Sequence, residues 1–384
     1  MPLGEVLKPG VVKRAGSREY PILSMTMRDG LVDQESKFRK RVASADLSQY
    51  KVIRRDQLVV GFPIDEGVLA FQELYDEAIV SPAYGVWDLK APQSVDPEYL
   101  QKYLRSPRAL SYYRSRLQGT TARRRSLPSS IFLALEVPLP PIEEQRRIAA
   151  ILNHADALRA KRREALASLD ELTQSIFIDM FGDPIVNPHG YPIRNLQELI
   201  DPTRPVTYGI LKPGQDFGEE GVKYIRVVDM KDGDILVDDL RSTSPEIAES
   251  YRRSRLTSGD LLMSIRGHVG RMATVPDSLD GANITQDTAR LAVTGASTVY
   301  VRECISTAGF KRWMDRHTKG VAVKGINLGD VKQMPIPIPQ PRQQDEFARI
   351  AASVGFQRST VRKSLSALEA AFASLQFRAF RGEL

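Results

Sequence analysis

Cysteine is almost absent from this chain, which has one, Cys304, among 384 residues. A single thiol excludes an internal disulfide framework and a metal site built from several thiolates. We expect Cys304 to be a small buried apolar residue, because a free cysteine usually packs as one. The four histidines are scattered along the chain without the spacing of metal ligands. Neither cross-links nor a bound metal therefore enter the predicted fold.

Long apolar runs are missing too. No apolar run approaches the roughly 18 residues that a membrane-spanning helix needs. The N-terminal residues, MPLGEVLKPGVVKRAG, lack the apolar segment and small-residue cleavage site of a secretory signal. We therefore expect a cytoplasmic protein.

Motifs of catalysis and cofactor binding are also lacking. The sequence has no glycine-rich dinucleotide fingerprint, no phosphate-binding loop ending in Gly-Lys-Ser/Thr, and no Asn-Pro-Pro-Tyr element of base methylation. Asp229, Asp232 and Asp234 lie close together, but the twelve-position pattern of a calcium loop fails, and we interpret them as a hairpin turn. We expect a non-catalytic chain without a cofactor of its own, which argues against a stand-alone nuclease or methyltransferase.

Positive charge is present in excess. Lysine and arginine number 54 against 47 acidic residues, so the net charge is +7 and the isoelectric point is near 9.3. This balance favours an acidic partner such as nucleic acid. The hydrophobic fraction of 42% is ordinary for a folded protein, and the length suggests two or three domains.

The longest regular pattern follows a proline-rich lead at residues 138–141. Glycine and proline are absent from Ile142 to Phe181, and the acids Glu143 and Glu144 suit the positive end of a helix dipole. At about 1.5 Å per residue, this predicts a helix roughly 60 Å long. Apolar residues recur in steps of three and four, as in a coiled-coil seam. They are Ile148, Ile151, Ala155, Leu158, Ala165, Leu169, Leu172 and Ile176. A core helix of one large domain is the alternative.

A second stretch, from Pro337 to Phe380, repeats this plan. Residues paired at an offset of 199 (337 − 138) include Pro138 and Pro337, Gln145 and Gln344, and Phe181 and Phe380. The globular parts also match: hairpin residues 20–32 with 221–237, residues 52–60 with 256–264, and a helical region near Tyr99 with 299–317. Such matches indicate an internal duplication.

The predicted fold class is therefore α+β. Two mixed α/β regions are separated by a pair of long antiparallel coiled-coil helices, and the halves form an internal repeat with pseudo-two-fold symmetry. The predicted globular regions are residues 1–137 and 183–336, and the predicted spacer segments are residues 138–182 and 337–384.

This order of elements resembles the specificity subunits of type I restriction-modification systems. The motifs that carry the resemblance are PLPPIEEQRRI at residues 138–148, MFGDP at 180–184, TYGILKPG at 207–214 and VKGINL at 323–328. Their order, spacing and duplication extend the resemblance over essentially the whole chain. The second lead departs from the first, with RQQDE at residues 342–346 where the first has EEQ at 143–145.

The resemblance implies a DNA-reading subunit without chemistry of its own. Each globular region would be a target-recognition domain for one half of a split, asymmetric target, and the helix pair would set the spacing of the halves. The implied partners are double-stranded DNA, two methyltransferase subunits and restriction-translocase subunits. The methyl donor, S-adenosylmethionine, would bind to the methyltransferase. The alternative is a coiled-coil scaffold that docks proteins and binds no DNA.

Candidate DNA contacts are basic, aromatic or amide-bearing residues of loops, because arginine can read guanine or hold phosphate. They are Arg123, Arg124, Arg125, Tyr208, Lys212, Arg266, His268, Arg271, Lys324 and Asn327. For the loop of residues 264–271, an ordinary charged hairpin is an equal alternative. For the loops that precede the two long helices, we favour DNA contact over a solvated face. We interpret the basic cluster at residues 159–163 as a solvated or partner-binding helix face.

Overall fold

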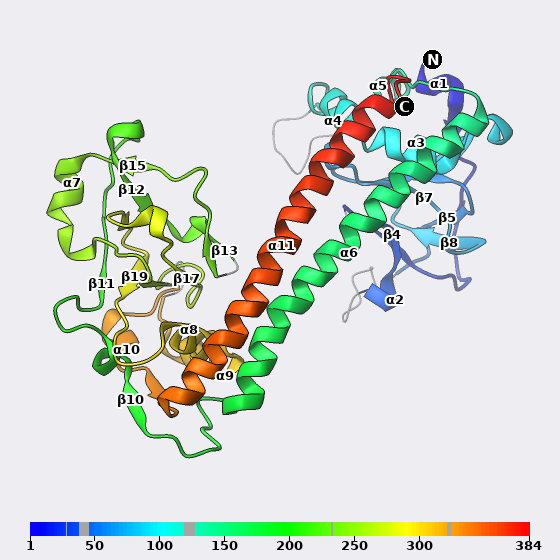
Figure 1. Cartoon of the computed structure of the whole chain (residues 1–384). Coiled ribbons are helices and arrows are strands. Elements are labelled where there is room, and N and C mark those ends of the chain that lie inside the picture. The colour runs from blue at the N-terminus through cyan, green and yellow to red at the C-terminus, as the bar shows by residue number, and fades with distance from the viewer. Residues whose placement is uncertain (28, 38–45, 119–126, 232, 321–323) are drawn as a thin grey trace. The chain divides into compact units, whose positions relative to one another are not determined.

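The computed structural model describes residues 1–384 except 28, 38–45, 119–126, 232 and 321–323 (Figure 1). The chain divides into two compact units. Unit 1 comprises Met1–Lys161 and Leu365–Leu384, and unit 2 comprises Arg162–Ser364. Helices and strands are mixed in both units, in agreement with the predicted α+β class.

Two long helices, α6 (Ile142–Phe181) and α11 (Pro341–Ala379), contribute residues to both units and contain 40 and 39 residues. Each begins directly after a proline-rich lead, as the sequence predicts. Glu144 lies in the first turn of α6, where its charge suits the helix dipole. The Arg147 guanidinium donates Nε to Glu144 Oε2 and Nη2 to Glu144 Oε1, both at 2.7 Å. This bidentate hydrogen bonding lowers the pKa of the Glu144 carboxyl.

Within each unit, α6 and α11 lie side by side and run antiparallel. In unit 1, Arg147 Nη2 donates to the Leu384 carbonyl at 2.9 Å, and the Arg159 guanidinium lies 4.2 Å from the Phe372 ring centre. Higher residue numbers on α6 therefore lie beside lower residue numbers on α11, as in an antiparallel pair. In unit 2, the Arg358 guanidinium lies 3.3 Å from an Asp170 carboxylate oxygen.

The predicted seam of α6 includes Ile148, which is 2% exposed, and also Ile151, Ala155 and Leu158, which line one groove with residues of α11 such as Leu368. Leu158 and Leu172 are 40% and 42% exposed, whereas Leu152 is fully buried and Arg159 faces α11 through the Phe372 ring. A straight helix has 3.6 residues per turn, so a strict 3.5-residue seam drifts by about 20° per heptad. Neighbouring residues such as Leu152 and Arg159 therefore join the predicted series.

Unit 1 holds the N-terminal strands and short helices. Its strands are β1 (Leu7–Pro9), β2 (Lys13–Arg14), β3 (Leu23–Thr26), β4 (Gly30–Asp33), β5 (Lys51–Arg54), β6 (Leu58–Val60), β7 (Leu69–Phe71), β8 (Glu77–Val80) and β9 (Gly85–Leu89). Its short helices are α1 (Leu3–Val6), α2 (Gln34–Lys37), α3 (Pro97–Leu104), α4 (Pro107–Arg114) and α5 (Ser129–Leu133). The β3–β4 pair is the hairpin predicted at residues 20–32.

Unit 2 holds the remaining elements. Its strands are β10 (Ile193–Asn195), β11 (Thr207–Tyr208), β12 (Val222–Ile225), β13 (Met230–Lys231), β14 (Asp234–Ile235), β15 (Ser242–Thr243), β16 (Leu261–Ser264), β17 (Met272–Thr274), β18 (Asn283–Ile284), β19 (Thr288–Leu291) and β20 (Pro335–Pro337). Its short helices are α7 (Pro245–Ser250), α8 (Thr298–Ser306), α9 (Ala308–His317) and α10 (Leu328–Lys332). Asp234 begins β14 in the β13–β14 hairpin, as the hairpin interpretation predicts. The interpretation is wrong for Asp229, which lies before the hairpin, is 5% exposed and pairs with Arg226. Asp232 lies outside the described residues.

A four-stranded antiparallel sheet of the same strand order occurs in each unit. Unit 1 has the order β1-β9-β6-β7, and unit 2 has the order β11-β19-β16-β17. In unit 1, Val59 of β6 lies between Val86 of β9 and Ala70 of β7. In unit 2, Leu262 of β16 occupies the corresponding central position. The two sheets therefore share one topology.

The main core of each unit joins this sheet to helices. Leu58, Tyr99 and Tyr103 are fully buried in unit 1, and Leu261, Tyr300 and Cys304 are fully buried in unit 2. The full burial of Cys304 confirms that it is a small core residue, and this burial raises the pKa of its thiol. Among the described helices, none combines the length and apolar character that a membrane span needs.

Candidate nucleic-acid interface

Two loops of unit 2 that carry candidate DNA contacts are joined by backbone hydrogen bonds. Arg266 forms an antiparallel bridge with Gly325. The Gly267 amide donates to the Lys324 carbonyl at 3.0 Å, and the Ile326 amide donates to the Ile265 carbonyl at 2.9 Å. The structure therefore brings the loop after β16, residues 265–271, against the residues that precede α10.

The loop after β16 is held in a tight conformation. Gly267 and Gly270 have φ angles of 72° and 85°, in the left-handed region that favours glycine. The Ser264 hydroxyl donates to the His268 carbonyl and accepts a hydrogen bond from the Arg271 amide at 2.8 Å. These bonds close the loop and leave the side chains of Arg266 and His268 exposed.

Arg266 is the most open arginine of this loop. Its side chain is 53% exposed, and Nη1 lies 3.8 Å from an Asp287 carboxylate oxygen. An ion pair of this length and exposure contributes about 1 kcal/mol or less, so the guanidinium remains available to a ligand. Lys324 and Lys319 are also exposed, and Lys319 pairs with Gly325 through two backbone hydrogen bonds of 2.8 and 2.9 Å. Positive charge therefore gathers around the bridge.

Tyr208 lies at the end of the β11-β19-β16-β17 sheet from which the loop after β16 leaves. Tyr208 on β11 is 45% exposed and pairs with Ala289 of β19. Two residues later, the Ile210 amide donates to the Ile284 carbonyl at 2.8 Å, close to the turn that carries Asp287. Lys212 is exposed in the loop that follows. Tyr208 thus extends the candidate surface across β19, and Lys212 follows four residues later in the chain.

A very close backbone crossing positions this segment. A Cβ atom at Gly209 would lie 1.9 Å from the Ile284 carbonyl oxygen. Only glycine lets the end of β11 approach β18 so closely. The sequence offered this glycine within TYGILKPG, but the crossing itself depends on a strand more than 70 residues away.

Arg271 and Asn327 have structural partners. The Arg271 Nη1 donates to the carbonyls of Val227 and Met230, both at 3.0 Å. Asn327 is the N-cap of α10: its Oδ1 accepts from the Asp330 amide at 2.8 Å, and its Nδ2 donates to Asp330 Oδ2 at 2.5 Å. These bonds fix both side chains within the fold, and their contact with DNA stays a prediction.

The candidate residues Arg123, Arg124 and Arg125 lie outside the described residues. In the described part of unit 1, the loop between β6 and β7 occupies the place that residues 265–271 occupy in unit 2. It carries Asp65 and Glu66 and has an exposed Phe62. The two units therefore present chemically different loops on sheets of the same order.

Sequence reasoning missed two contributors to the unit 2 surface. Lys319 joins the surface through its pairing with Gly325, and Asp287 faces Arg266. Neither residue lies in a distinctive motif, so only the fold reveals them. Among the residues that the structure describes, no group of three or more His, Cys, Asp or Glu side chains could hold a metal ion. What the surface offers is guanidinium, ammonium and aromatic groups, which suit phosphates and base edges.

The fold, with two mixed α/β units that each contain part of two long antiparallel helices, is also found in solved structures. A chain from a type I restriction-modification system matches with a TM-score of 0.55 and 18% identity, covering 100% of this chain and 97% of that one. The specificity subunit of the type I system from M. genitalium matches with a TM-score of 0.52 and 15% identity, covering 99% of this chain and 95% of that one.

Curated relatives are of the same kind. The type I restriction enzyme EcoBI specificity subunit of Escherichia coli is 28% identical over 279 residues, which are 65% of this chain and 58% of the relative. The MjaVIII specificity subunit of Methanocaldococcus jannaschii is 23% identical over 167 residues, 40% of this chain and 38% of the relative. The matched regions thus span less than two thirds of these relatives. No protein-family model matches the chain. These findings confirm the resemblance to type I specificity subunits.

Proposed function

We propose that the chain is the DNA-specificity subunit of a type I restriction-modification complex. One observation carries the proposal: two units share a sheet order and a long-helix pair, while their exposed loops differ in charge. A shared frame with different loops suits a protein that reads two different sequences with one architecture. The similarity to curated specificity subunits supports the same conclusion.

In this proposal, each globular region reads one half of a split and asymmetric target. Residues 1–137 and 183–336 are the target-recognition domains, and the segments 138–182 and 337–384 form the spacer. A helix of 40 residues rises about 1.5 Å per residue and can hold two half-sites at a fixed separation. In unit 2, Arg266, Lys324 and Tyr208 face the DNA, with arginine the residue best suited to guanine.

The chain itself is non-catalytic in this proposal. It supplies binding and orientation, and two methyltransferase subunits carry S-adenosylmethionine and the methyl transfer. Restriction-translocase subunits join this complex for cleavage in the cytoplasm. Exposed apolar side chains at corresponding positions of the long helices, Ile178 and Phe377, are suited to contacts with such protein partners, with exposures of 43% and 61%.

A competition binding assay tests the proposal. The chain, reconstituted with its methyltransferase partner, should prefer one bipartite duplex over scrambled duplexes. Changing the number of base pairs between the two halves should abolish that preference, because the helices fix the separation. Affinity should also fall steeply with salt, since phosphate contacts release counterions. Equal binding to all sequences and spacings, with little salt dependence, would instead indicate a scaffold that binds no DNA.

A further inference from the structure

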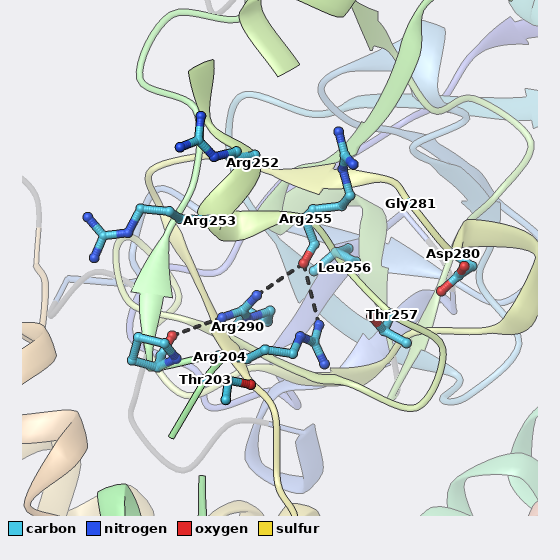
Figure 2. Close-up of a pocket in the computed structure, with 11 residues that line it drawn as sticks. Thr203, Arg204, Arg252, Arg253, Arg255, Leu256, Thr257, Asp280, Gly281 and Arg290 are labelled. Atoms are coloured by element: carbon cyan, nitrogen blue, oxygen red, sulfur yellow. Dashed lines mark hydrogen bonds between the residues drawn. The ribbon is translucent and has the colours of Figure 1, made fainter. Parts of the chain in front are cut away.

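A second basic feature of unit 2 is a pocket of about 360 Å³ (Figure 2). It lies between the segment before β11, the turn after α7, and β19. Its arginines are Arg204, Arg252, Arg253, Arg255 and Arg290. Asp280 is an acidic residue of the same lining. Like charges brought this close repel one another, so the pocket favours an anion.

Two of these arginines form the floor. Arg204 makes a bidentate pair with the buried carboxylate of Asp260, with bonds of 2.9 and 2.5 Å. Arg290 is 2% exposed, and its guanidinium donates to the carbonyls of Arg255 at 3.1 Å and Pro205 at 2.9 Å. Burial, and then the charge of Arg204, lower the pKa of Arg290. The Arg290 Nε is buried without a hydrogen-bond partner among the described residues. Carbonyl dipoles thus surround a desolvated cation.

The rim of the pocket offers open donors. Figure 2 shows Arg252 and Arg253 extending away from the turn that carries them. Within the described part of the chain, Arg253 has no hydrogen bond or ion pair. Arg252 lies 4.0 Å from Glu249, whose other oxygen pairs with Arg255 at 3.0 Å. One exposed carboxylate therefore serves two arginines, and positive charge remains in excess at the rim.

The turn that presents these arginines is η7 (Arg252–Ser254). Hydrogen bonds to the buried side chain of Asn283 hold this turn in place. The Ser254 hydroxyl donates to Asn283 Oδ1 at 2.6 Å, and both side chains are 1% exposed. Asn283 Nδ2 donates to the Tyr251 carbonyl at 3.3 Å. Buried hydrogen bonds therefore preorganise the turn before any ligand arrives.

The pocket and the candidate interface lie at opposite ends of β16. The interface loop follows Ser264, whereas the pocket residues of the turn after α7, Arg252 to Thr257, precede Leu261, and Arg290 pairs with Leu262 near that same end. Four residues of strand span about 13 Å, which is close to the roughly 12 Å width of the DNA major groove. A duplex whose bases meet the interface loops can therefore bring a backbone phosphate to the pocket.

We propose that this arginine pocket binds a phosphate group of the DNA backbone beside the half-target that unit 2 reads. The assignment deepens the proposed function and rests on it. Phosphate contacts fix the register of a protein on a duplex without reading sequence, and base contacts at the loops supply the specificity. Inorganic phosphate has the same chemistry, and the experiment distinguishes the two sources.

The test compares variants of the full chain in complex with its methyltransferase partner. Affinity is measured over a range of salt for a duplex that carries the methylated motif and for a scrambled duplex. The double variant Arg252→Gln/Arg253→Gln should weaken binding to both duplexes by about tenfold. It should lower the slope of log K against log salt by about 1 to 2, with an unchanged ratio between duplexes.

Two further variants distinguish an effect of charge at the pocket from an effect of the overall charge of the protein. Glu249→Gln removes the carboxylate that competes for the rim arginines, so it should tighten binding to both duplexes. Arg194→Gln on β10 is the matched control, because Figure 1 places β10 and α7 at opposite ends of unit 2. This control should leave the salt slope at the wild-type value. Both Arg194 and Glu249 are exposed, so neither substitution threatens the fold.

The outcomes are distinct. If wild type prefers the motif but the double variant matches Arg194→Gln, the pocket does not bind the backbone and the inference is overturned. It is also overturned if inorganic phosphate stabilises wild type, but not the double variant, against heat while their DNA affinities are equal. A wild-type complex that prefers no duplex overturns the proposed function, and the inference falls with it.

Discussion

Unit 1 and unit 2 hold the long helices with the same side chains. The Gln145 amide near the start of α6 donates to the Pro140 carbonyl at 2.8 Å, and Gln344 of α11 donates to the Pro339 carbonyl at 2.9 Å. These glutamines are 1% and 4% exposed. Both fix a proline-rich lead against the helix that follows it.

The same glutamines tie each helix to its globular region. Their Oε1 atoms accept hydrogen bonds from the amides of Asp96 at 2.9 Å and Ser297 at 2.8 Å, the N-caps of α3 and α8. Three residues further, the hydroxyls of Tyr99 and Tyr300 donate to the first proline carbonyl of each lead, at 2.8 and 2.7 Å. Each tyrosine also packs on a phenylalanine from the end of the other helix.

The units differ at their loops. Residues 61–68 of unit 1 carry Asp65 and Glu66, whereas residues 265–271 of unit 2 carry Arg266 and Arg271. The comparison teaches that the anchor is separate from the reading surface. A frame of this kind can keep its helix contacts while its loops change, as recognition of two different half-targets requires.

The largest expected effect comes from the aromatic anchor. Phe181 packs at 5.1 Å from Tyr300, and Phe380 packs at 5.7 Å from Tyr99, measured between ring centres. Truncating a buried phenylalanine to alanine costs about 3–5 kcal/mol. Phe181→Ala should therefore destabilise unit 2, and Phe380→Ala should destabilise unit 1.

The two tryptophans make this measurable, because Trp87 lies in unit 1 and Trp313 in unit 2. Chemical unfolding followed by fluorescence, with the other tryptophan replaced by phenylalanine, reports each unit separately. The exposed Phe377→Ala is the matched control. If either variant lowered the unfolding free energy of both units equally, the assignment of one aromatic anchor to each unit would be contradicted.

A second difference concerns a pair of glycines, 199 residues apart. Gly209 has its Cβ position 1.9 Å from the Ile284 carbonyl oxygen, whereas the nearest atom to the Cβ position of Gly10 is 3.0 Å away. Gly209→Ala should cost about 3 kcal/mol in unit 2, because the backbone itself must move. Gly10→Ala should cost about 1 kcal/mol or less in unit 1. Similar losses of unfolding free energy in the two variants would contradict this crossing.

The buried glutamines test how alike the anchors are. Removing one leaves a buried N-cap amide without its acceptor, at a cost of about 1–3 kcal/mol. Gln145→Ala and Gln344→Ala should each lower the stability of their own unit by about 2 kcal/mol. The exposed Gln333→Ala provides a control with little effect. A loss in one variant only would show that the anchors are not equivalent.

The smallest effect is expected at an ion pair of unit 2. Asp234 of the β13–β14 hairpin accepts from Arg358 at 3.2 Å and from Arg362 at 2.6 Å on α11. Its side chain is 47% exposed, so Asp234→Asn should cost about 1 kcal/mol or less, and less at high salt. Asp179→Asn, exposed on α6, is the control. A loss above about 3 kcal/mol would mark the hairpin as a principal anchor.

The sequence predicted the features that local chemistry determines. Absence of glycine and proline, with acids in the first turn, gave α6 nearly its observed bounds, and the match at an offset of 199 residues gave those of α11. An Asp-Gly turn between apolar segments gave the β3–β4 hairpin. The seam series did not include Leu152 and Arg159, because the width of the contact face depends on the course of both helices, which periodicity alone does not specify.

The candidate site was harder to predict, since it depends on contacts distant in sequence. Arg266 and Lys324 were both chosen from composition, but only the bridge to Gly325 brings them together. Arg271 has the same residue type as Arg266, yet it turns inward to two carbonyls. The pocket arginines were not among the candidates: Arg252, Arg253 and Arg255 adjoin one another in sequence, but Arg290 joins them only through the sheet register.

The division of labour between the two units is the central claim, and methylation mapping tests it most directly. Residues 190–330 are replaced by the corresponding region of another specificity subunit, and the methylated motifs in DNA exposed to the reconstituted complex are mapped. The proposal predicts a bipartite motif in which one half changes and the other half and its methylation stay. A change in both halves would contradict the proposal, as would no change in either half.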